Sequence, residues 1–431
     1  MMWSQMFLSP GLLEISVPPP TGSNEGLLSH LEAAALLRYI GTTCRGIQRL
    51  SIFPDRAPIT DYKKSICATS LLMEFWDGSL AQHLAQFDTL RSLCTTTEAL
   101  GPSVINQLAQ LPNLESLVIY PSSQPLEPTA IILSSPFPAL RAFSLEQTPY
   151  SLFSEICKLQ ILRRVASLRL VFTNSPDDED DEDGNDDNYN DSDNDDDDND
   201  DANNNEDSDD EEEESLWAIS LITLVWNNCP ELSDLSIDFD CYGGSGDFVI
   251  SLDSIKFPMK GLPLQKLSLR HAVISAGWDL MPSVWPQLEV LELPRHWATP
   301  DELLLFARLP RLETLVVKLS LTEPLPKLNH SLDWDASLHF STLRSSTNVR
   351  IKGDIYNISQ WLLSLWPALE RIERYVGPDN DDEDDQTLSE LTGTTVLALN
   401  RMIDMLREIN KTKLRIAAKP YAEDALKLFS L

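Results

Sequence analysis

Leucines return along the chain in a short frame, L-x-x-L-x-L, whose last three positions alternate apolar and polar. The segment LPNLESLVIY at 111–120 has counterparts in FPALRAFSLE (137–146), CPELSDLSID (229–238), WPQLEVLELP (285–294) and LPRLETLVVK (309–318). In L-x-L the two leucines point to one face of an extended strand and the residue between them to the other. Each copy therefore predicts a short strand with one buried face.

The spacing of these frames indicates a repeat. Most neighbouring frames lie 24 to 32 residues apart, the 67-residue step contains an acidic run of 38 residues, and the 57-residue step can hold two units of about 28. This period is that of leucine-rich repeats or slightly above it. The first position of the frame falls at Leu12, Ile47, Leu90, Leu114, Leu140, Val165, Leu232, Leu264, Leu288, Leu312 and Leu369.

The segments between the frames have apolar residues at helical spacing. In TPDELLLFARLPR, Thr299 stands at an N-cap position, Pro300 follows at the first helical position, and Glu302 completes a capping box. GPSVINQLAQLPN (101–113) and SLFSEICKLQILRR (151–164) show the same periodicity. Proline just before the frame cannot continue a helix, so it marks the change from helix to strand.

One strand and one helix per repeat predict an α/β fold, an irregular leucine-rich-repeat solenoid with a curved parallel sheet inside and helices outside. The alternative is an ordinary doubly wound α/β domain, but a recurring proline before the frame is not expected there. The most regular repeats carry Asn at the ninth position, and its absence here predicts irregular turns. That position holds Ser122, Thr148, Thr173, Asp240, Ala272, His296 and Ser320.

Two strongly acidic stretches interrupt the predicted repeats. The chain has a formal net charge of −34 over 431 residues, and 25 acids without a base lie at 177–214. Six more acids lie in DNDDEDD at 379–385, and outside both stretches 36 acids stand against 33 bases. Like charges at this density do not collapse around a core, so we expect a disordered insertion in a strand-to-helix loop. Such an insertion either binds a partner or is a solvated loop without a ligand.

The chain is therefore predicted to have five parts. An apolar stripe in the last part, at Val396, Leu399, Ile403 and Leu406, predicts a helix that caps the final repeat, with a docking helix for a partner as the alternative. The parts are N-terminal repeats at 1–176, the acidic insertion at 177–214, C-terminal repeats at 215–378, an acidic loop at 379–387, and a helical cap at 388–431.

No catalytic or metal-binding pattern stands out. The stretch GGSGD at 243–247 has Asp247 where a nucleophile elbow needs glycine, and the acidic run around Gly184 does not fit a calcium-binding loop. The histidines lack metal-ligand spacing, and no phosphate-binding loop or dinucleotide fingerprint occurs. We therefore expect no enzymatic activity, no cofactor and no metal.

The charge, the N-terminus and the cysteines also limit the expected partners and location. Nucleic acid and anionic membranes would repel the acidic run. The N-terminus does not resemble a secretory signal, no apolar run is long enough to span a bilayer, and the six cysteines form no CxxC pair. We expect a monomer in the cytosol or nucleus, whose partners are proteins, with basic proteins as candidates for 177–214.

Alternate strand positions offer the best candidates for binding. If the strands align, residues before and between the last two leucine positions, and the one after, face the concave side of the sheet. A hydrated sheet face without a ligand is the alternative. The predicted partner-binding residues are Tyr120, Glu146, Arg169, Asp234, Asp238, Lys266, Arg270, Glu292 and Lys318.

The proline-preceded frames, with FLSPGLLEISV (7–17) and the helical HLEAAALLRYIGTTCRGIQRLSI (30–52), resemble the repeat region of basidiomycete F-box proteins. The F-box itself, a short helical module, is not found before residue 11. The resemblance implies a substrate-recognition scaffold linked to a cullin ubiquitin ligase. The alternatives are an acidic-tract chaperone for basic proteins such as histones, and a GTPase regulator of the leucine-rich-repeat type.

Overall fold

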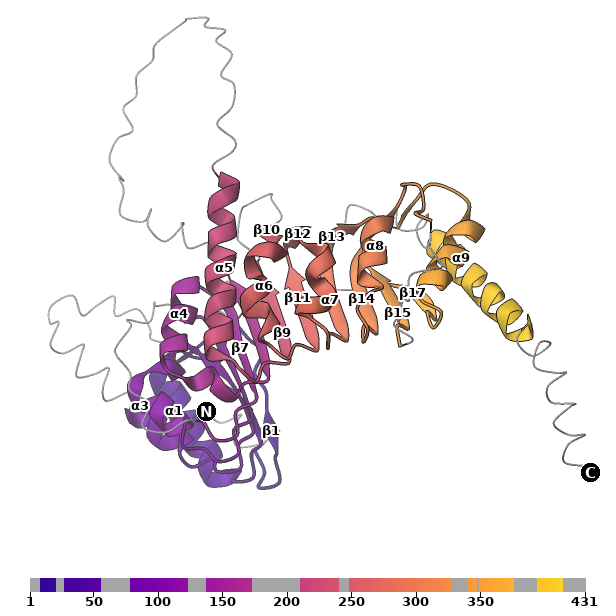
Figure 1. Cartoon of the computed structure of the whole chain (residues 1–431). Coiled ribbons are helices and arrows are strands. Elements are labelled where there is room, and N and C mark those ends of the chain that lie inside the picture. The colour runs from indigo at the N-terminus through magenta and orange to yellow at the C-terminus, as the bar shows by residue number, and fades with distance from the viewer. Residues whose placement is uncertain are drawn as a thin grey trace, which may run out of the picture. The chain divides into compact units, whose positions relative to one another are not determined.

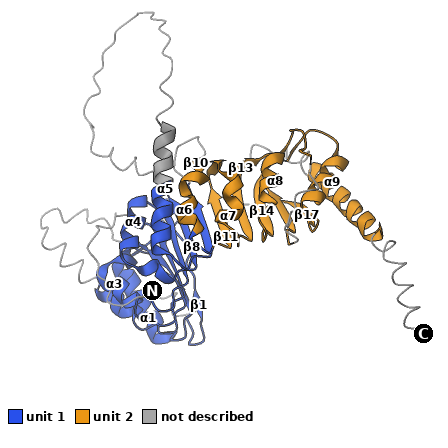
Figure 2. Ribbon diagram, viewed as in Figure 1, with its two compact units in different colours: residues 1–246, 261–263 blue, residues 247–260, 264–431 orange. Residues whose placement is uncertain are grey.

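The structure, a computed structural model, divides the chain into two compact units (Figures 1 and 2). Unit 1 contains residues 1–246 and 261–263, and unit 2 contains residues 247–260 and 264–431. The structure describes residues 8–20, 27–55, 78–122, 137–172, 210–239, 248–327, 339–346, 349–375 and 394–413, with the backbone alone at 210–218.

Unit 1 is built on a parallel sheet whose strands follow one another in chain order. Within this sheet, each strand pairs in parallel with the next strand of the sheet along the chain. A separate short pair joins β2 (Leu28–Ser29) to β4 (Pro54–Asp55). The sheet contains β1 (Glu14–Ile15), β3 (Arg49–Ser51), β5 (Ser92–Thr96), β6 (Ser116–Tyr120), β7 (Ala142–Thr148), β8 (Ser167–Phe172) and β9 (Asp234–Asp238).

Unit 2 repeats this plan. Its sheet is parallel and again in chain order, with β16 (Arg350–Ile351) beside the end of one strand. A second parallel pair joins β10 (Phe248–Ser251) to β12 (Ala272–Ala276). The sheet contains β11 (Lys266–Arg270), β13 (Val290–Ala298), β14 (Thr314–Leu321), β15 (Thr342–Ser345) and β17 (Arg371–Arg374).

Helices follow the strands along one side of each sheet (Figure 1). The predicted capping box of α8 (Pro300–Phe306) is present, with the Thr299 hydroxyl accepting from the Glu302 backbone amide. Unit 1 has α1 (His30–Thr43), residues 78–84, η2 (Thr97–Leu100), α3 (Pro102–Leu108), α4 (Tyr150–Lys158), η3 (Ile161–Arg164) and α5 (Asp210–Asn228). Unit 2 has α6 (Leu252–Lys260), η6 (Trp278–Leu280), α7 (Met281–Val284), α8 (Pro300–Phe306), α9 (Ile355–Leu365) and residues 394–413.

Strand order, parallel register and one connection per strand confirm the leucine-rich-repeat architecture. The apolar positions of the frame form the core: from Ile47 to Leu369, every predicted first position is at most 1 % exposed. The 57-residue step does hold two units, because Phe340 takes the first position before β15 and is fully buried. Because its first position holds phenylalanine, the leucine frame did not predict this repeat.

A tight turn precedes most of the frames, and where the frame is preceded by proline, as in WPQL and WPAL, the proline belongs to this turn. In WPQL, the amide of Leu288 donates to the carbonyl of Trp285, and in WPAL the amide of Leu369 donates to Trp366 at 3.0 Å. This bond joins residues three apart and leaves proline second in the turn, where its fixed φ is favoured. The two residues joined by this hydrogen bond, the first residue of the motif and the first leucine of the frame, are both buried. The turn therefore anchors the start of the strand to the core.

A repeated backbone contact then sets the register. The carbonyl of Gln48 accepts the amides of both Arg91 and Ser92, and the carbonyl of Glu289 accepts those of Glu313 and Thr314. The same pattern recurs at other repeats in both units. Each frame is thus placed by the one before it, and corresponding residues fall opposite one another.

The turns after the strands are irregular, as predicted. His271, directly after β11, has a left-handed φ of 52°, and Gln147, near the end of β7, has one of 51°. The register shifts after Leu145 and again between Glu292 and Trp297. Without an asparagine ladder, each repeat satisfies its backbone groups locally, and strands of unequal length result.

The acidic segments fall mainly outside the described residues. Of the predicted insertion at 177–214, the structure describes the backbone from Asp210, where α5 begins, so its last five residues are helical rather than disordered. Glutamate is a good helix former and acids stabilise a helix N-terminus, which accounts for this earlier start. The predicted acidic loop at 379–387 lies outside the described residues.

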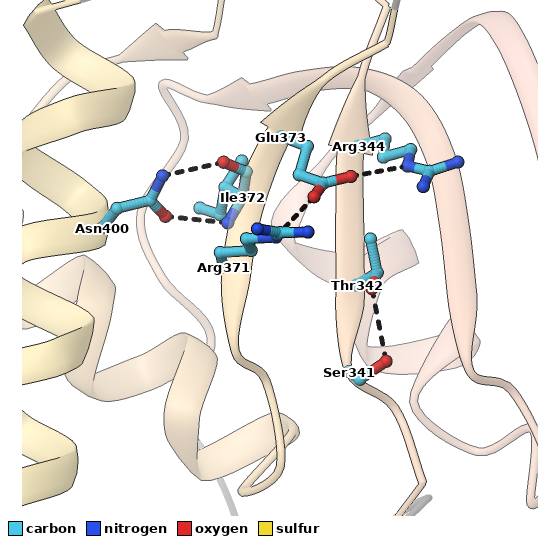
Figure 3. Close-up of polar contacts among 7 residues, drawn as sticks. All are labelled: Ser341, Thr342, Arg344, Arg371, Ile372, Glu373 and Asn400. Atoms are coloured by element: carbon cyan, nitrogen blue, oxygen red, sulfur yellow. Dashed lines mark hydrogen bonds and ion pairs between the residues drawn. The ribbon is translucent and has the colours of Figure 1, made fainter.

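The predicted C-terminal helix is present at 394–413, and its stripe faces the core. Leu399 and Ile403 are fully buried, and Leu406 is 7 % exposed. Asn400 on this helix closes the edge of β17: its Oδ1 accepts from the amide of Ile372 and its Nδ2 donates to the carbonyl of Ile372, both at 2.8 Å (Figure 3). One side chain thus makes the two bonds that a further strand would make.

Candidate partner-binding face

The strand residues that alternate with the buried ones form the open face of each sheet, opposite the frame leucines. Lys266 and Arg270 of β11 are partly exposed and alternate with the fully buried Leu267 and Leu269, whereas Ser268 on the same side is only 1 % exposed. Register pairs residues of neighbouring strands on the same face. All nine predicted binding residues lie in described strands and, by this register, on the open face of one unit or the other.

In unit 1 the structure brings three predicted residues together. Arg169 Nε lies 2.9 Å from Glu146 Oε1, and the same carboxylate accepts from the Ser144 hydroxyl at 2.6 Å. Burial, followed by the negative charge of Glu146, raises the pKa of Tyr120 to about 12, although Arg169 opposes this shift. Tyr120 therefore keeps its proton and remains a hydrogen-bond donor at neutral pH.

Two residues that sequence reasoning did not select complete this cluster. The Phe53 ring meets the Tyr120 ring edge to face at 5.6 Å between centroids. Burial, with the charge of Glu146, raises the pKa of the Cys94 thiol to about 11. Since Cys94 is protonated, the cluster contains one acid, one base and several neutral donors on a fixed backbone.

The two aspartates predicted on β9 differ in exposure. Asp234 is partly exposed at the start of the strand, whereas Asp238 is 5 % exposed. Asp238 therefore offers little surface to a partner, and Asp234 extends the open face next to Ser167.

In unit 2 the predicted residues are engaged with each other or with neighbours. Lys266 Nζ lies 3.2 Å from Glu292 Oε1 across β11 and β13, with the carboxylate 12 % exposed. Arg270 Nη2 lies 3.4 Å from the hydroxyl of Tyr375, which directly follows β17. These contacts hold long side chains over the sheet rather than out in solvent.

A second charge group on this face was not predicted. Glu373 lies between two arginines: Arg344 Nε is 2.9 Å from its carboxylate, and Arg371 pairs with its other oxygen (Figure 3). The leucine frame did not predict these residues. The position before β15 where the frame expects leucine holds Phe340, and the copy of the motif before β17 is weak. Register with β14 would have found Arg344, which pairs with Val316.

The predicted Lys318 has an aromatic neighbour that sequence reasoning also missed. Trp297 is the register partner of Lys318, whose Nζ lies 5.6 Å from the centre of the indole. Arg350 stacks on the same indole with its guanidinium carbon 3.9 Å from the ring centre. The irregular register of β13 brings Trp297 to this position, so the frame spacing gave no signal for it.

The open faces of the two units differ in the sign of their charge. Register places two bases and four acids on the described open face of unit 1, and six bases and two acids on that of unit 2. The unit 1 residues are Arg49 and Arg169, with Glu14, Glu146, Asp234 and Asp238. The unit 2 residues are Lys266, Arg270, Lys318, Arg344, Arg350 and Arg371, with Glu292 and Glu373.

Other chemistries find no support in the part of the chain that the structure describes. No group of three or more metal-binding side chains occurs there, and no described helix is long and apolar enough to cross a bilayer. The described cysteines, at 44, 94, 157 and 229, are free thiols. Burial raises the pKa of Cys157 to about 12, so this thiol is unreactive at neutral pH.

No protein-family model matches the chain, and no curated protein matches it. Among solved structures, the chain is similar to an internalin (inlF) from Listeria monocytogenes, with 11 % sequence identity, a TM-score of 0.29, and coverage of 80 % of this chain and 70 % of that chain. The fold assignment above rests on strand order and register.

Proposed function

We propose that the protein is a non-enzymatic recognition scaffold that binds partner proteins on the open faces of its sheets. The observation that carries this proposal is the alignment of charged and aromatic side chains on a rigid parallel sheet, as in the Tyr120, Glu146 and Arg169 cluster. Side chains held in one arrangement lose less entropy on binding. The side chains fixed on the open face point to binding rather than catalysis.

The resemblance to F-box proteins supports a finer proposal. We infer that the repeats select substrates for a cullin ubiquitin ligase, as the proline-preceded frames suggest. Free thiols among the described residues support a reducing location, the cytosol or nucleus. A second candidate is the binding of basic proteins, which the 25 acids at 177–214 favour.

The test compares partners captured by the tagged full chain and by charge-reversal variants. Arg169→Glu places a second carboxylate beside Glu146 on the open face, so we expect recovery of open-face partners to fall about tenfold, as for the loss of a charge-assisted contact. Arg163→Glu, at an exposed position in η3, is the matched control with the same charge change.

Quantitative mass spectrometry of the captured proteins distinguishes the alternatives. Ligase subunits among the partners would support the proposed role in substrate selection for a cullin ubiquitin ligase. Loss of basic partners on deletion of 177–209, with no effect of Arg169→Glu, would replace the scaffold proposal by the acidic-tract candidate. Equal loss with both arginine variants would refute a specific open face.

A further inference from the structure

The open face of unit 2 has a charge opposite to that of the whole chain. It carries six bases and two acids by register, while the full sequence has a net charge of −34. Glutamates do precede the strands, at Glu289, Glu313 and Glu370, so the N-terminal edge of the sheet is acidic. The accessible basic excess therefore lies further along the strands, towards Lys318 and Arg350.

An aromatic side chain lies in this basic region. Trp297 is contacted by the Arg350 guanidinium at 3.9 Å and by Lys318 at 5.6 Å, each measured to the ring centre. Stacking on the indole orients the guanidinium while its edge donors remain available for a carboxylate. Arg350 itself is exposed and Trp297 is partly exposed, so this arrangement is accessible from solvent.

The two acids of the face are already occupied. Glu292 pairs with Lys266, and Glu373 lies between Arg344 and Arg371. These pairs hold the basic side chains in fixed directions, and Arg344 and Lys266 remain 40 % and 42 % exposed. The face thus offers single oriented cations rather than a continuous row, since Arg344 lies in register between Val316 and Glu373.

We propose that the open face of unit 2 binds an acidic, extended peptide segment of a partner protein, with Trp297, Lys318 and Arg350 as its anchor. This inference rests on the scaffold function proposed above and names the chemical class of its partner. Lys318 and Arg350 both contact the indole of Trp297, so a short acidic segment can present one carboxylate to each of the two cations.

Charge also favours a peptide over nucleic acid. A polyphosphate chain carries charge along its whole length and would be repelled by the rest of this acidic chain. Glu292 and Glu373 on the face itself would oppose a continuous row of phosphates, whereas a short peptide can place neutral residues opposite them. We therefore expect discrimination between the two polyanions.

The test measures fluorescence anisotropy of labelled probes with the full-length chain at low ionic strength. The probes are a peptide of about ten residues alternating Glu and Ser, its Gln counterpart, and single-stranded DNA of similar length. We expect binding of the Glu peptide alone. Reversal of two anchors in Lys318→Glu/Arg350→Glu should weaken it more than about tenfold.

Arg308→Glu/Arg311→Glu is the matched control, because it reverses two exposed bases of unit 2 outside the strands. Trp297→Leu tests the stacking separately and should weaken binding while the circular dichroism spectrum is unchanged. Equal weakening by the control pair would overturn the proposal, as would tighter binding of DNA or no binding of the Glu peptide. If partner capture still depends on Arg169 in that case, the scaffold function stands and only this assignment fails.

Discussion

Asn400 is the clearest case of a single residue that completes the sheet. Its amide satisfies both backbone groups of Ile372 at 2.8 Å, and it lies on the helix whose Leu399 and Ile403 are fully buried. A strand edge left without these bonds exposes an amide and a carbonyl. The side chain is therefore structural.

Replacement of Asn400 by alanine should lower the free energy of unfolding by about 1–3 kcal/mol, because two partly buried backbone groups lose their partner. Urea unfolding followed by circular dichroism measures this change. Asn410→Ala, at an exposed position of the same helix, is the control and should be neutral. Equal losses for both variants would contradict the assigned role.

Glu302 links stability to pH. Burial raises the pKa of its carboxyl, but the nearby His296, whose Nε2 lies 3.4 Å from Oε1, and hydrogen bonds from the backbone amide and hydroxyl of Thr299 outweigh burial, so its pKa lies below the ordinary value of 4.5. A lowered folded-state pKa stabilises the fold above the unfolded-state pKa, and this stability is lost as pH falls through the folded-state pKa.

The Glu302→Gln variant should therefore be less stable than the wild type at pH 7, and the difference should shrink as pH falls below about 4.5. Thermal unfolding between neutral pH and pH 3 checks this. Asp301→Asn removes an acid from the same helical turn and serves as the control. A constant difference at every pH would show that the capping geometry alone matters.

For single residues, the sequence predicted which face of the sheet each one occupies but not every contact between them. The positions of Tyr120, Glu146 and Arg169 followed from strand alternation, and the structure brings them together. The contact of Arg350 with Trp297 did not follow, because it depends on an irregular register within β13. Alternation fixes which face a residue occupies, whereas register decides which residues meet.

The element that recurs most faithfully is the turn before each strand. Its first residue is buried, and the amide of the first frame residue donates to the carbonyl of that residue, as from Leu369 to Trp366. The same bond forms without proline, from Ile47 to Cys44 and from Leu90 to Phe87, so proline favours this turn but is not required for it. Helix lengths varied with the length of each connection and were not predictable from the period.

Substitution of Trp366, the first residue of one such turn, tests how much the turn contributes to stability. It is fully buried, and its ring stacks on Phe340 of the preceding repeat at 4.2 Å between centroids. Trp366→Ala should lower the free energy of unfolding by about 3–5 kcal/mol through the cavity it leaves. Trp366→Phe should cost much less, because the indole N–H has no hydrogen-bond partner among the described residues.

Chemical denaturation of these two variants is compared with Trp226→Ala, whose indole is 41 % exposed. A small loss for Trp366→Ala would mean that the turn does not anchor the repeat. A loss for Trp366→Phe as large as that for alanine would indicate a hidden bond to the indole nitrogen.

Charge acts over the whole molecule. A net charge of −34 opposes the compact state through self-repulsion. Between ionic strengths of about 0.01 M and 0.15 M the Debye length falls from about 30 Å to about 8 Å, which screens this repulsion. Surface ion pairs such as Arg91 with Glu115 lose little, since exposed pairs contribute only about 0–1 kcal/mol.

We therefore expect the melting temperature to rise with sodium chloride, by about 2–4 °C for each kcal/mol of stabilisation. Deletion of 177–209 removes 20 acids and changes the net charge from −34 to −14, and it leaves the start of α5 in place. The salt dependence should flatten in that variant. An unchanged salt dependence would place the repulsion in the repeats themselves.

The way in which the last strand of unit 2 is finished has a practical consequence. Because Asn400 makes both backbone hydrogen bonds that a neighbouring strand would make, the helix at 394–413 can close any strand edge of the same geometry. An engineered extra repeat would therefore be inserted immediately before this helix, which would then cap the new last strand.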